Sequence, residues 1–323
     1  MSNHQPTISV RVARKRQEAL DICSFELVAE DGAALPAFSA GSHVDVHLPG
    51  GLTRPYSLCN PPGENHRYLI GVLRDPASRG GSHAMHDQVA AGQSLQISAP
   101  VNHFALAHDA KRHLLLAGGI GVTPILCMAE RLANTGADFE MHYCTRSPDR
   151  TAFYQRITES SFAPRVHFHF DDGAAGQKLD MASVLAAPAS GVHLYVCGPR
   201  GFMDAVLGTA RQNGWPEAQL HYEFFAGAVT ASSTDASFEV QLASTGQVVV
   251  VPLGKTVVQA LAEAGVEVQM SCEQGVCGTC LTRVIEGIPD HKDMYLTPEE
   301  QAVNDQFTPC CSRSKSPRLV LDL

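Results

Sequence analysis

The chain has 323 residues, of which 44% are hydrophobic and 18% charged, and its formal net charge is -9 at pH 7. The length predicts two or three domains, and the composition is that of an ordinary globular protein. The acidic balance argues against a nucleic-acid-binding surface, because nothing supplies the basic patch that phosphates require.

The N-terminal residues 1–20 lack the apolar stretch that defines a signal peptide. No apolar run elsewhere in the sequence approaches the roughly 18 residues of a membrane span. We therefore expect a cytoplasmic protein with no membrane partner.

The first block, residues 1 to about 105, has the pattern of a β domain. Its short apolar runs alternate with polar residues or are β-branched, and Gly, Pro and Asn turns separate them. Closely spaced strands without long helices are typical of an antiparallel barrel or sandwich. One helix is predicted over roughly residues 82–89. The predicted strands cover residues 8–13, 24–29, 43–48, 67–73 and 94–98.

Three residues that follow a predicted strand, Arg54, Tyr56 and Ser57, have the chemistry that a flavin needs. An arginine can pair with a phosphate through its bidentate fork, and a tyrosine ring can lie against the isoalloxazine face. The hydroxyl of Ser57 can hydrogen-bond the flavin ring near N5. The alternative is a solvent-exposed Arg–Tyr strand.

Gly80, Gly81 and Ser82 open the predicted helix of this block. A glycine-rich turn at a helix N-terminus presents free N–H groups to a phosphate. An ordinary capped helix is the alternative. Because this motif and the preceding one occur together, we interpret the pair as a flavin site.

The second block, residues 106 to about 226, alternates strands with helices. Such alternation predicts an open parallel sheet with helices on both faces. The first helix is expected over residues 124–133, with Thr123 as its N-cap and Pro124 at its first position. A later helix is expected near residues 201–212. The predicted strands cover residues 113–117, 139–145, 166–170, 192–197 and 219–224.

A glycine-rich loop joins the first strand and helix of this block. It contains Gly118, Gly119, Gly121, Thr123 and Pro124 in the pattern G-G-x-G-x-T-P. This pattern departs from the dinucleotide fingerprint G-x-G-x-x-G, so the loop does not indicate that fold family. Glycines still permit close approach of the backbone to a ligand, and the helix N-terminus favours a pyrophosphate.

The small, polar residues 227–236 are predicted to form an interdomain linker. Beyond it, residues 238–243 and 247–252 flank a Ser-Thr-Gly turn and predict a β-hairpin. Thr256 and Gln259 then form a capping box that opens a helix, which Gly265 ends. Residues 266–270 are expected to form a further strand.

Cys272, Cys277 and Cys280 have the C-x4-C-x2-C spacing of a plant-type [2Fe–2S] loop, whose fourth ligand comes from a distant segment. That fourth ligand is Cys310 or Cys311. A zinc ribbon is the alternative, but it would pair two C-x2-C knuckles and only one is present. The scattered cysteines are predicted to be small buried apolar residues. They are Cys23, Cys59, Cys127, Cys144 and Cys197.

Residues 237–323 resemble plant-type ferredoxins, through the loop SCEQGVCGTC and the ending CCSRSKSPRLVLDL. The R-x-Y-S and G-G-x-G-x-T-P motifs resemble those of ferredoxin reductases. Taken in this order, the whole chain resembles the family of phthalate dioxygenase reductase and vanillate demethylase reductase. The ferredoxin resemblance favours Cys310 as the fourth ligand, with Gly275 and Gly278 letting the loop curl around the cluster.

The resemblance implies a multidomain protein with three folds. These are an FMN-binding antiparallel β-barrel over residues 1–105, a nicotinamide-binding α/β domain over 106–226 and, after the linker, an α+β domain of the β-grasp type over 237–323. It further implies FMN rather than FAD and NADH rather than NADPH. Cys197, Gly198 and Pro199 would lie beside the nicotinamide, and Phe225 would pack on the flavin.

The function implied is electron transfer from NADH through FMN to the [2Fe–2S] cluster, and then to the Rieske centre of a partner oxygenase. No catalytic side chain beyond the cofactors is expected. A stand-alone NADH oxidase or dye reductase is an alternative, although an oxidase needs no cluster. A non-enzymatic iron–sulfur redox sensor is a weaker one.

Overall fold

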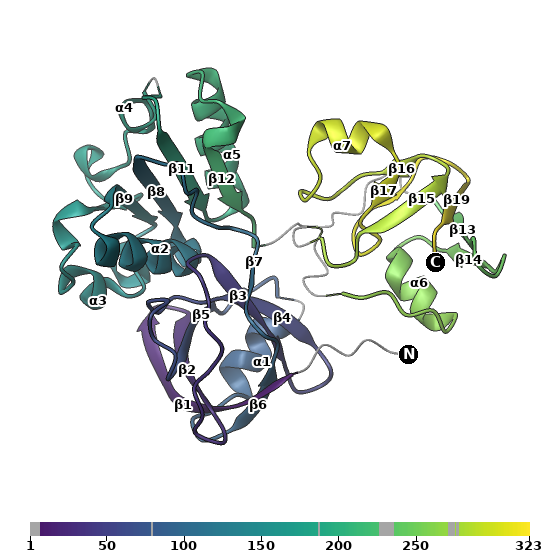
Figure 1. Ribbon diagram of the computed structural model, residues 1–323, viewed down its shortest axis with the longest axis horizontal. Coiled ribbons are helices and arrows are strands. Elements are labelled where there is room, and N and C mark those ends of the chain that lie inside the picture. The colour runs from purple at the N-terminus through teal and green to yellow at the C-terminus, as the bar shows by residue number, and fades with distance from the viewer. Residues whose placement is uncertain (1–6, 79, 187, 226–235, 271–274, 276–277) are drawn as a thin grey trace. The chain divides into compact units, whose positions relative to one another are not determined.

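The computed structural model describes residues 7–78, 80–186, 188–225, 236–270, 275 and 278–323 (Figure 1). The chain divides into two compact units, residues 1–225 and 226–323. Cys272, Cys277 and most of the predicted linker therefore lie outside the described residues. Within the described ranges, no helix has both the length and the apolar character needed to cross a membrane.

The first part of the N-terminal unit is an antiparallel barrel. Its sheet has the order β4-β3-β6-β1-β2-β5, with β7 paired to β3, and a bridge between Leu58 and Ile70 joins its two edges. Apolar side chains such as Phe25 and Val44 alternate into the interior. The predicted antiparallel strands are confirmed. The strands are β1 (Ile8–Ala19), β2 (Ile22–Ala29), β3 (Ser42–His47), β4 (Thr53–Ser57), β5 (Tyr68–Leu73), β6 (Ser94–Ile97) and β7 (Val101–Asn102).

One helix of the barrel, α1 (Gly81–Asp87), is held at its C-terminal end by Lys15 on β1. The Lys15 ammonium donates hydrogen bonds to the carbonyl oxygens of Met85, His86 and Val89, at 3.3, 2.6 and 2.8 Å. These carbonyls belong to the last turn and its exit, where intrahelical partners run out. The positive charge also complements the negative end of the helix dipole.

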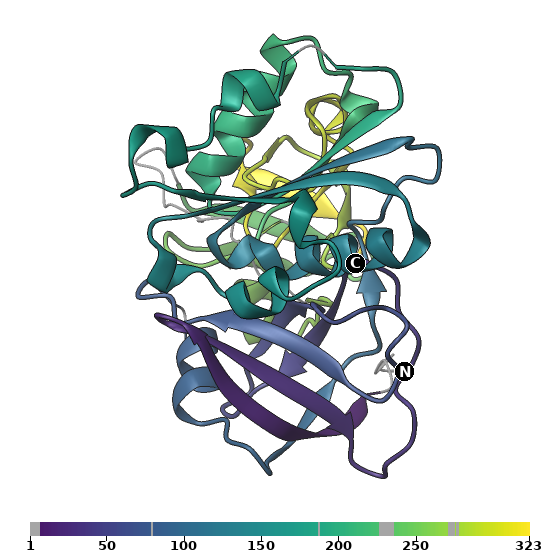
Figure 2. The same ribbon diagram turned by 90° about the vertical axis from the view of Figure 1, so that its left-hand side faces the viewer.

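The rest of the N-terminal unit is a parallel sheet of order β10-β9-β8-β11-β12 (Figure 2). Leu115 and Tyr195 belong to the core on one face, together with residues of α2, while Leu116 faces a second core containing α5 residues. Helices on both faces are therefore confirmed. The elements are β8 (Arg112–Gly118), α2 (Val122–Thr135), β9 (Asp138–Thr145), α3 (Tyr154–Thr158), β10 (Val166–Phe170), α4 (Met181–Val184), β11 (Val192–Cys197), α5 (Arg200–Gln212) and β12 (Leu220–Glu223).

The prediction of Thr123 as the N-cap of α2 is wrong. A 3-10 turn over Gly119–Gly121 leads straight into the helix, so the cap position falls on Gly121. The hydroxyl of Thr123 donates backwards to the carbonyl oxygen of Ile120 at 3.1 Å and accepts no helical N–H. Pro124 consequently stands third in the first turn, where it still breaks no intrahelical bond.

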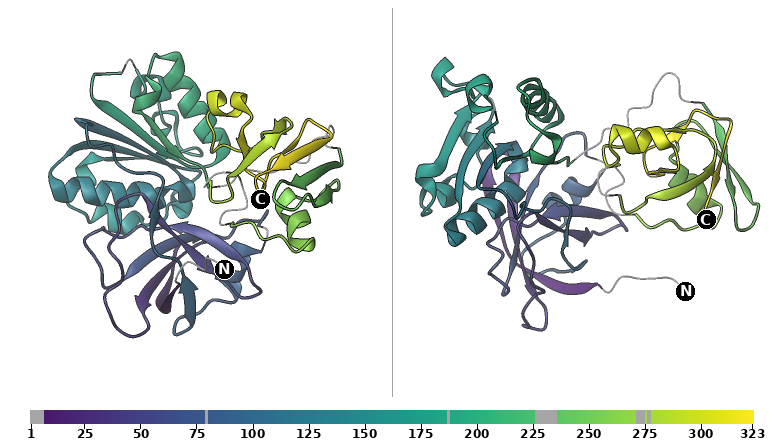
Figure 3. Two further views of the ribbon diagram at one scale, coloured as in Figure 1. Left: turned by 45° about the vertical axis from the view of Figure 1, so that its right-hand side comes forward. Right: turned by 45° about the horizontal axis from the view of Figure 1, so that its top comes forward.

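The C-terminal unit is a mixed sheet of order β14-β13-β19-β15-β17 with α6 packed into its core (Figure 3). Strands β13 and β19 are parallel, and the other pairs in the sheet are antiparallel. This is the α+β architecture that was expected. The elements are β13 (Phe238–Leu242), β14 (Val248–Val251), α6 (Val257–Glu263), β15 (Thr282–Glu286), β16 (Pro289–Asp290), α7 (Pro298–Val303), β17 (Gln306–Phe307), β18 (Arg313–Ser314) and β19 (Arg318–Leu321).

The capping box at Thr256 and Gln259 is confirmed, with reciprocal hydrogen bonds of 3.2 and 3.0 Å. The strand predicted over residues 266–270 is wrong. The N–H of Val266 donates to the carbonyl oxygen of Leu261 at 2.9 Å, so it closes the end of α6 and enters no ladder. Val266 and Val268 instead pack against the core as irregular chain.

Candidate functional site

The two motifs predicted to bind the flavin meet in the barrel. Arg54 on β4 is 9% exposed, and a Cβ atom added to Gly81 would lie 2.6 Å from its Cγ. Glycine at the start of α1 therefore lets the arginine stem cross the helix N-terminus. Gly80 has a φ of 91°, a backbone conformation that glycine adopts without strain. The guanidinium and the helix N-terminus fit a phosphate group.

The neighbouring residues Tyr56 and Ser57 of β4 have hydroxyl groups in a largely buried environment. Burial raises the pKa of Tyr56 well above its usual range, so the phenol stays protonated. Ser57 is buried, and its hydroxyl donates to Oε2 of Glu223 at 3.3 Å. Ser82, at the other motif, accepts a hydrogen bond at its hydroxyl from the N–H of Asp75 at 3.1 Å.

The two segments predicted to lie beside the nicotinamide also converge. A Cβ atom on Gly121 would lie 2.2 Å from the carbonyl oxygen of Cys197, and one on Gly118 would lie 3.0 Å from Cδ of Pro199. A Cβ atom on Gly198 would lie 2.9 Å from Cα of Gly118. Only glycine fits where the two backbones approach this closely. The loops that follow β8 and β11 are therefore packed side by side at the carboxyl ends of these strands, which is where ligands bind in parallel sheets.

Glu223 joins the flavin and nicotinamide motifs, and the sequence motifs did not identify it. It ends β12, where it is the register partner of Cys197, and its carboxyl group accepts the hydrogen bond from Ser57. Burial raises the pKa of Glu223 to about 7, and the hydrogen bond from Ser57 opposes part of that rise. The sequence could have identified Glu223 as a candidate site residue. Ligands in parallel sheets bind at the carboxyl ends of strands, and Glu223 lies at that end of the predicted strand 219–224.

The thiol of Cys197 is not a nucleophile in this environment. It is fully buried, and burial together with the nearby Glu223 raises its pKa well above its usual range. A protonated thiol is unreactive. Cys59 and Cys127 are likewise buried, whereas Cys23 and Cys144 are half-buried.

The barrel packs directly on the nicotinamide loop. A Cβ atom on Gly71 of β5 would lie 2.8 Å from Cγ2 of Thr123. Phe225 is half-buried against the core that contains Cys197 and α2 residues, and its contact with a flavin stays a prediction. The predicted flavin and nicotinamide residues thus belong to one packed unit.

In the C-terminal unit, Cys280, Cys310 and Cys311 gather with Val258 in a small buried cluster. Gly275 and Gly278 both have a φ of 70°, the conformation predicted for a tightly curled loop. Thiols from the loop and from a distant segment, brought together away from water, fit a [2Fe–2S] cluster. Cys311 contacts the hydroxyl of Thr308 at 3.2 Å. On the ferredoxin resemblance Cys310 remains the predicted ligand, together with Cys280 and with Cys272 and Cys277, which lie outside the described residues.

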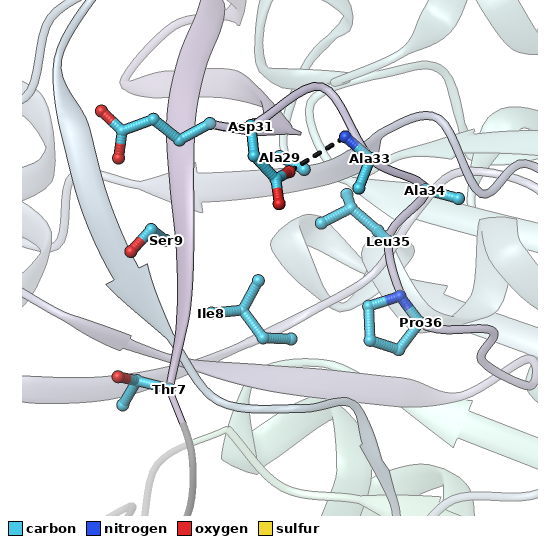
Figure 4. A pocket seen from close by; sticks show the side chains of 10 residues that line it. Thr7, Ile8, Ser9, Ala29, Asp31, Ala33, Ala34, Leu35 and Pro36 are labelled. Atoms are coloured by element: carbon cyan, nitrogen blue, oxygen red, sulfur yellow. Dashed lines mark hydrogen bonds between the residues drawn. The ribbon is translucent and has the colours of Figure 1, made fainter.

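A pocket of about 590 Å³ lies elsewhere on the barrel (Figure 4). It is lined by the start of β1 and the segment after β2, including Ile8, Leu35 and Pro36, and a hydrogen bond from Ala33 to Asp31 crosses its rim. None of the predicted site residues lines it. We assign no function to it.

A barrel, a parallel sheet with converging glycine loops and a ferredoxin-like unit define an electron-transfer oxidoreductase. Residues 240–315 match the model of the 2Fe-2S iron-sulfur cluster binding domain. Residues 97–220 match the N-terminal domain of dimethylamine monooxygenase subunit DmmA-like proteins.

Whole-chain relatives give the particular family. The vanillate O-demethylase oxidoreductase of Pseudomonas putida is 59% identical over 98% of this chain and 100% of its own length. The tetrachlorobenzoquinone reductase of Sphingobium chlorophenolicum is 43% identical over 100% of both chains. A solved phthalate dioxygenase reductase, described as a modular structure for electron transfer from pyridine nucleotides to [2Fe-2S], superposes with a TM-score of 0.80 at 39% identity, covering 98% of both chains. The chain belongs to this family of oxygenase and demethylase reductases.

Proposed function

We propose that this chain is the NADH-dependent reductase component of an aromatic O-demethylase of the vanillate type. It would carry electrons from NADH through FMN and a [2Fe–2S] cluster to a Rieske-type oxygenase. The observation that carries the proposal is the Ser57–Glu223–Cys197 junction: Ser57 donates a hydrogen bond to Glu223, which is the register partner of Cys197, so residues predicted for the flavin and for the nicotinamide lie together. The 59% identity to a vanillate enzyme, against 43% to a quinone reductase, supports the demethylase partner.

Each predicted site residue then has a positioning role. Bound FMN would supply the chemistry of this path, which is hydride acceptance from the nicotinamide and single-electron transfer to the [2Fe–2S] cluster. Arg54 and the N-terminus of α1 would hold the flavin phosphate, and Ser57 would orient the ring near N5. Gly118, Gly121 and Gly198 let the loops after β8 and β11 pack closely, and this packing would set the position of the nicotinamide. Glu223, whose pKa burial raises to about 7, would hold a proton on its carboxyl group below that pH and so lower the charge near the hydride path.

The preference for NADH is supported by the residues after β9. The guanidinium of Arg150 pairs with Asp21 at 3.5 Å, and Asp149 is hydrogen-bonded to Ser147. One of the two arginines of this segment is therefore engaged, and a carboxylate lies beside it. An adenosine 2′-phosphate would need clustered basic side chains here.

An anaerobic titration with NADH, followed by visible absorbance and EPR, tests the electron path. We expect the flavin and cluster bands to bleach together and a rhombic [2Fe–2S] signal to appear. Bleaching of the flavin alone would refute the path to the cluster. Adding a vanillate O-demethylase oxygenase component with vanillate tests the partner, since formaldehyde should form only when all the components and NADH are present.

A quinone reductase is the second candidate, because the tetrachlorobenzoquinone reductase shares the full length of the chain. Steady-state turnover distinguishes the two functions. A substituted benzoquinone reduced faster than the oxygenase component, at equal concentrations, would favour this candidate. The cytoplasmic location stays a prediction.

A further inference from the structure

A buried carboxylate that the electron path does not use lies beside the cluster loop. The side chain of Asp293 is 0% exposed. It accepts a hydrogen bond from the N–H of Leu296 at 2.9 Å and from the hydroxyl of Ser312 at 3.3 Å, and Nδ1 of His291 lies 3.3 Å away. Burying a carboxylate costs free energy unless its oxygens accept hydrogen bonds, as they do here. We therefore ask what this buried charge does.

The residues around Asp293 pack on the glycines of the cluster loop. The N–H of Met294 donates to the carbonyl oxygen of Gly275 at 2.9 Å. A Cβ atom on Gly275 would lie 2.9 Å from Cα of Asp293, and one on Gly278 would lie 2.2 Å from Cζ of Tyr295. The segment 293–295 therefore fixes the path of the loop at both glycines.

The same carboxylate is tied to the segment that carries the fourth predicted ligand. Ser312, two residues after Cys310, donates its hydroxyl to Asp293 and accepts the N–H of Lys292 at 3.1 Å. Its hydroxyl also contacts that of Thr308 at 3.1 Å, and Thr308 contacts Cys311. Asp293 thus connects the loop bearing three predicted ligands with the segment bearing the fourth.

We propose that Asp293 is a positioning residue that joins these two segments and lowers the reduction potential of the [2Fe–2S] cluster. The inference rests on the proposed function of the chain. Net charge and hydrogen bonding around a cluster set its potential, and a buried negative charge disfavours the addition of an electron. Because the side chain of Asp293 is 0% exposed, solvent screens this charge weakly.

The test compares Asp293→Asn with Asp290→Asn in the full chain, using anaerobic redox titrations read by EPR. Both variants lose one carboxylate of the same segment, but the side chain of Asp290 is 32% exposed and lies 3.9 Å from the ammonium of Lys292. We expect Asp293→Asn to shift the cluster potential to more positive values and to alter the EPR g-values. Asp290→Asn should leave both unchanged, and the flavin potential should be unchanged in both variants.

A cluster potential and g-values in Asp293→Asn equal to those of wild type would overturn the inference and leave the proposed function standing. Wild-type protein without a [2Fe–2S] signal would instead refute the proposed function itself. If Asp293→Asn does not retain the cluster, Ser312→Ala decides, because it keeps the carboxylate and removes only the bridging hydroxyl. Changed g-values in Ser312→Ala would then support the bridge, and wild-type values would overturn it.

Discussion

Glu223 is half-buried at the end of β12 in the N-terminal unit, and the ionisation of its carboxyl group should make the stability of that unit pH-sensitive. The pKa of Glu223 is raised from its ordinary 4.5 to about 7, with burial as the main cause. The folded protein therefore keeps a proton that the unfolded chain has already lost in this range. Stability from this group is intact below pH ~4.5, is lost as the pH rises toward ~7 and does not change above that.

Glu223→Gln should remove this pH dependence. Relative to wild type, the free energy of unfolding of the variant should rise by on the order of 3 kcal/mol between about pH 4 and about pH 8. Urea unfolding monitored by tryptophan fluorescence is the measurement. Trp215 is the one tryptophan of the sequence and lies in the core that faces α5, so it reports on the N-terminal unit. Glu159→Gln, at an exposed position of the same unit, is the control. Parallel pH profiles for Glu223→Gln and wild type would contradict the prediction.

At the residue scale, the sequence motifs predicted the residues that have a local pattern. Glycine is needed at positions 118, 121 and 198 because the loops approach closely there. A cluster of glycines is visible in the sequence, so such a close approach can be predicted from it. Glu223 has no such pattern, because its role comes from a hydrogen bond to Ser57, a residue far from it in the sequence. The packing of Arg54 on Gly81 follows from tertiary structure in the same way.

We expect NADH binding to depend on the close approach of the loops after β8 and β11. Gly121→Ala should disrupt this junction, because the new Cβ atom would lie 2.2 Å from the backbone oxygen of Cys197, which cannot move as a side chain could. We expect the affinity for NADH to fall at least about tenfold, a loss of roughly 1.4 kcal/mol in binding free energy. Rapid-mixing measurements of flavin reduction at varied NADH concentration would show this.

The matched control is Gly201→Ala in the first turn of α5. A Cβ atom there meets no other atom within 4 Å, and the residue is helical. Alanine is the better helix former by about 1 kcal/mol, so this variant should bind NADH normally and be as stable as wild type or more so. Normal NADH binding by Gly121→Ala would show that the junction does not position the nicotinamide.

The contact between α1 and β1 gives a second prediction for an element. Lys15→Met should leave three carbonyl oxygens at the end of α1 without their ammonium partner, while keeping most of the side-chain volume. Because α1 presents the predicted phosphate site at its other end, we expect stability to fall by about 1–2 kcal/mol and FMN to be released more easily. Flavin fluorescence during thermal release measures both effects. Arg11→Met, exposed on the same strand, should have neither effect.

Element boundaries were predictable where the side chains determine them. The capping box at Thr256 forms as expected, because Thr and Gln side chains three residues apart satisfy each other's backbone N–H groups. The wrong strand over residues 266–270 has the apolar alternation of a strand, but its first N–H already closes α6. Thr123 has the residue type of an N-cap, yet the preceding 3-10 turn moves the cap to Gly121. In both cases a backbone hydrogen bond with a neighbouring element sets the boundary of the helix, and amino-acid composition cannot predict such a bond.

At the scale of the whole molecule, the two units have separate hydrophobic cores. Among the described residues, the cores of the barrel and of the parallel sheet extend to Phe225, and the clusters of the C-terminal unit begin at Phe238. A domain with its own core can fold alone. The hydride-transfer and iron–sulfur chemistries should therefore be separable by truncation.

A chain ending at Phe225 should fold, bind FMN and be reduced by NADH at the wild-type rate, since the Ser57–Glu223–Cys197 junction lies wholly within it. It should reduce ferricyanide, which takes electrons directly from a flavin, but fail to support an oxygenase component, which takes them from the cluster. The control is the full chain with Cys310→Ser, which should lose the cluster but keep the C-terminal unit. It should behave like the truncated chain in both assays. Oxygenase activity supported by the truncated chain would mean that the flavin reaches the partner directly, and the ferredoxin-like unit would then need another role.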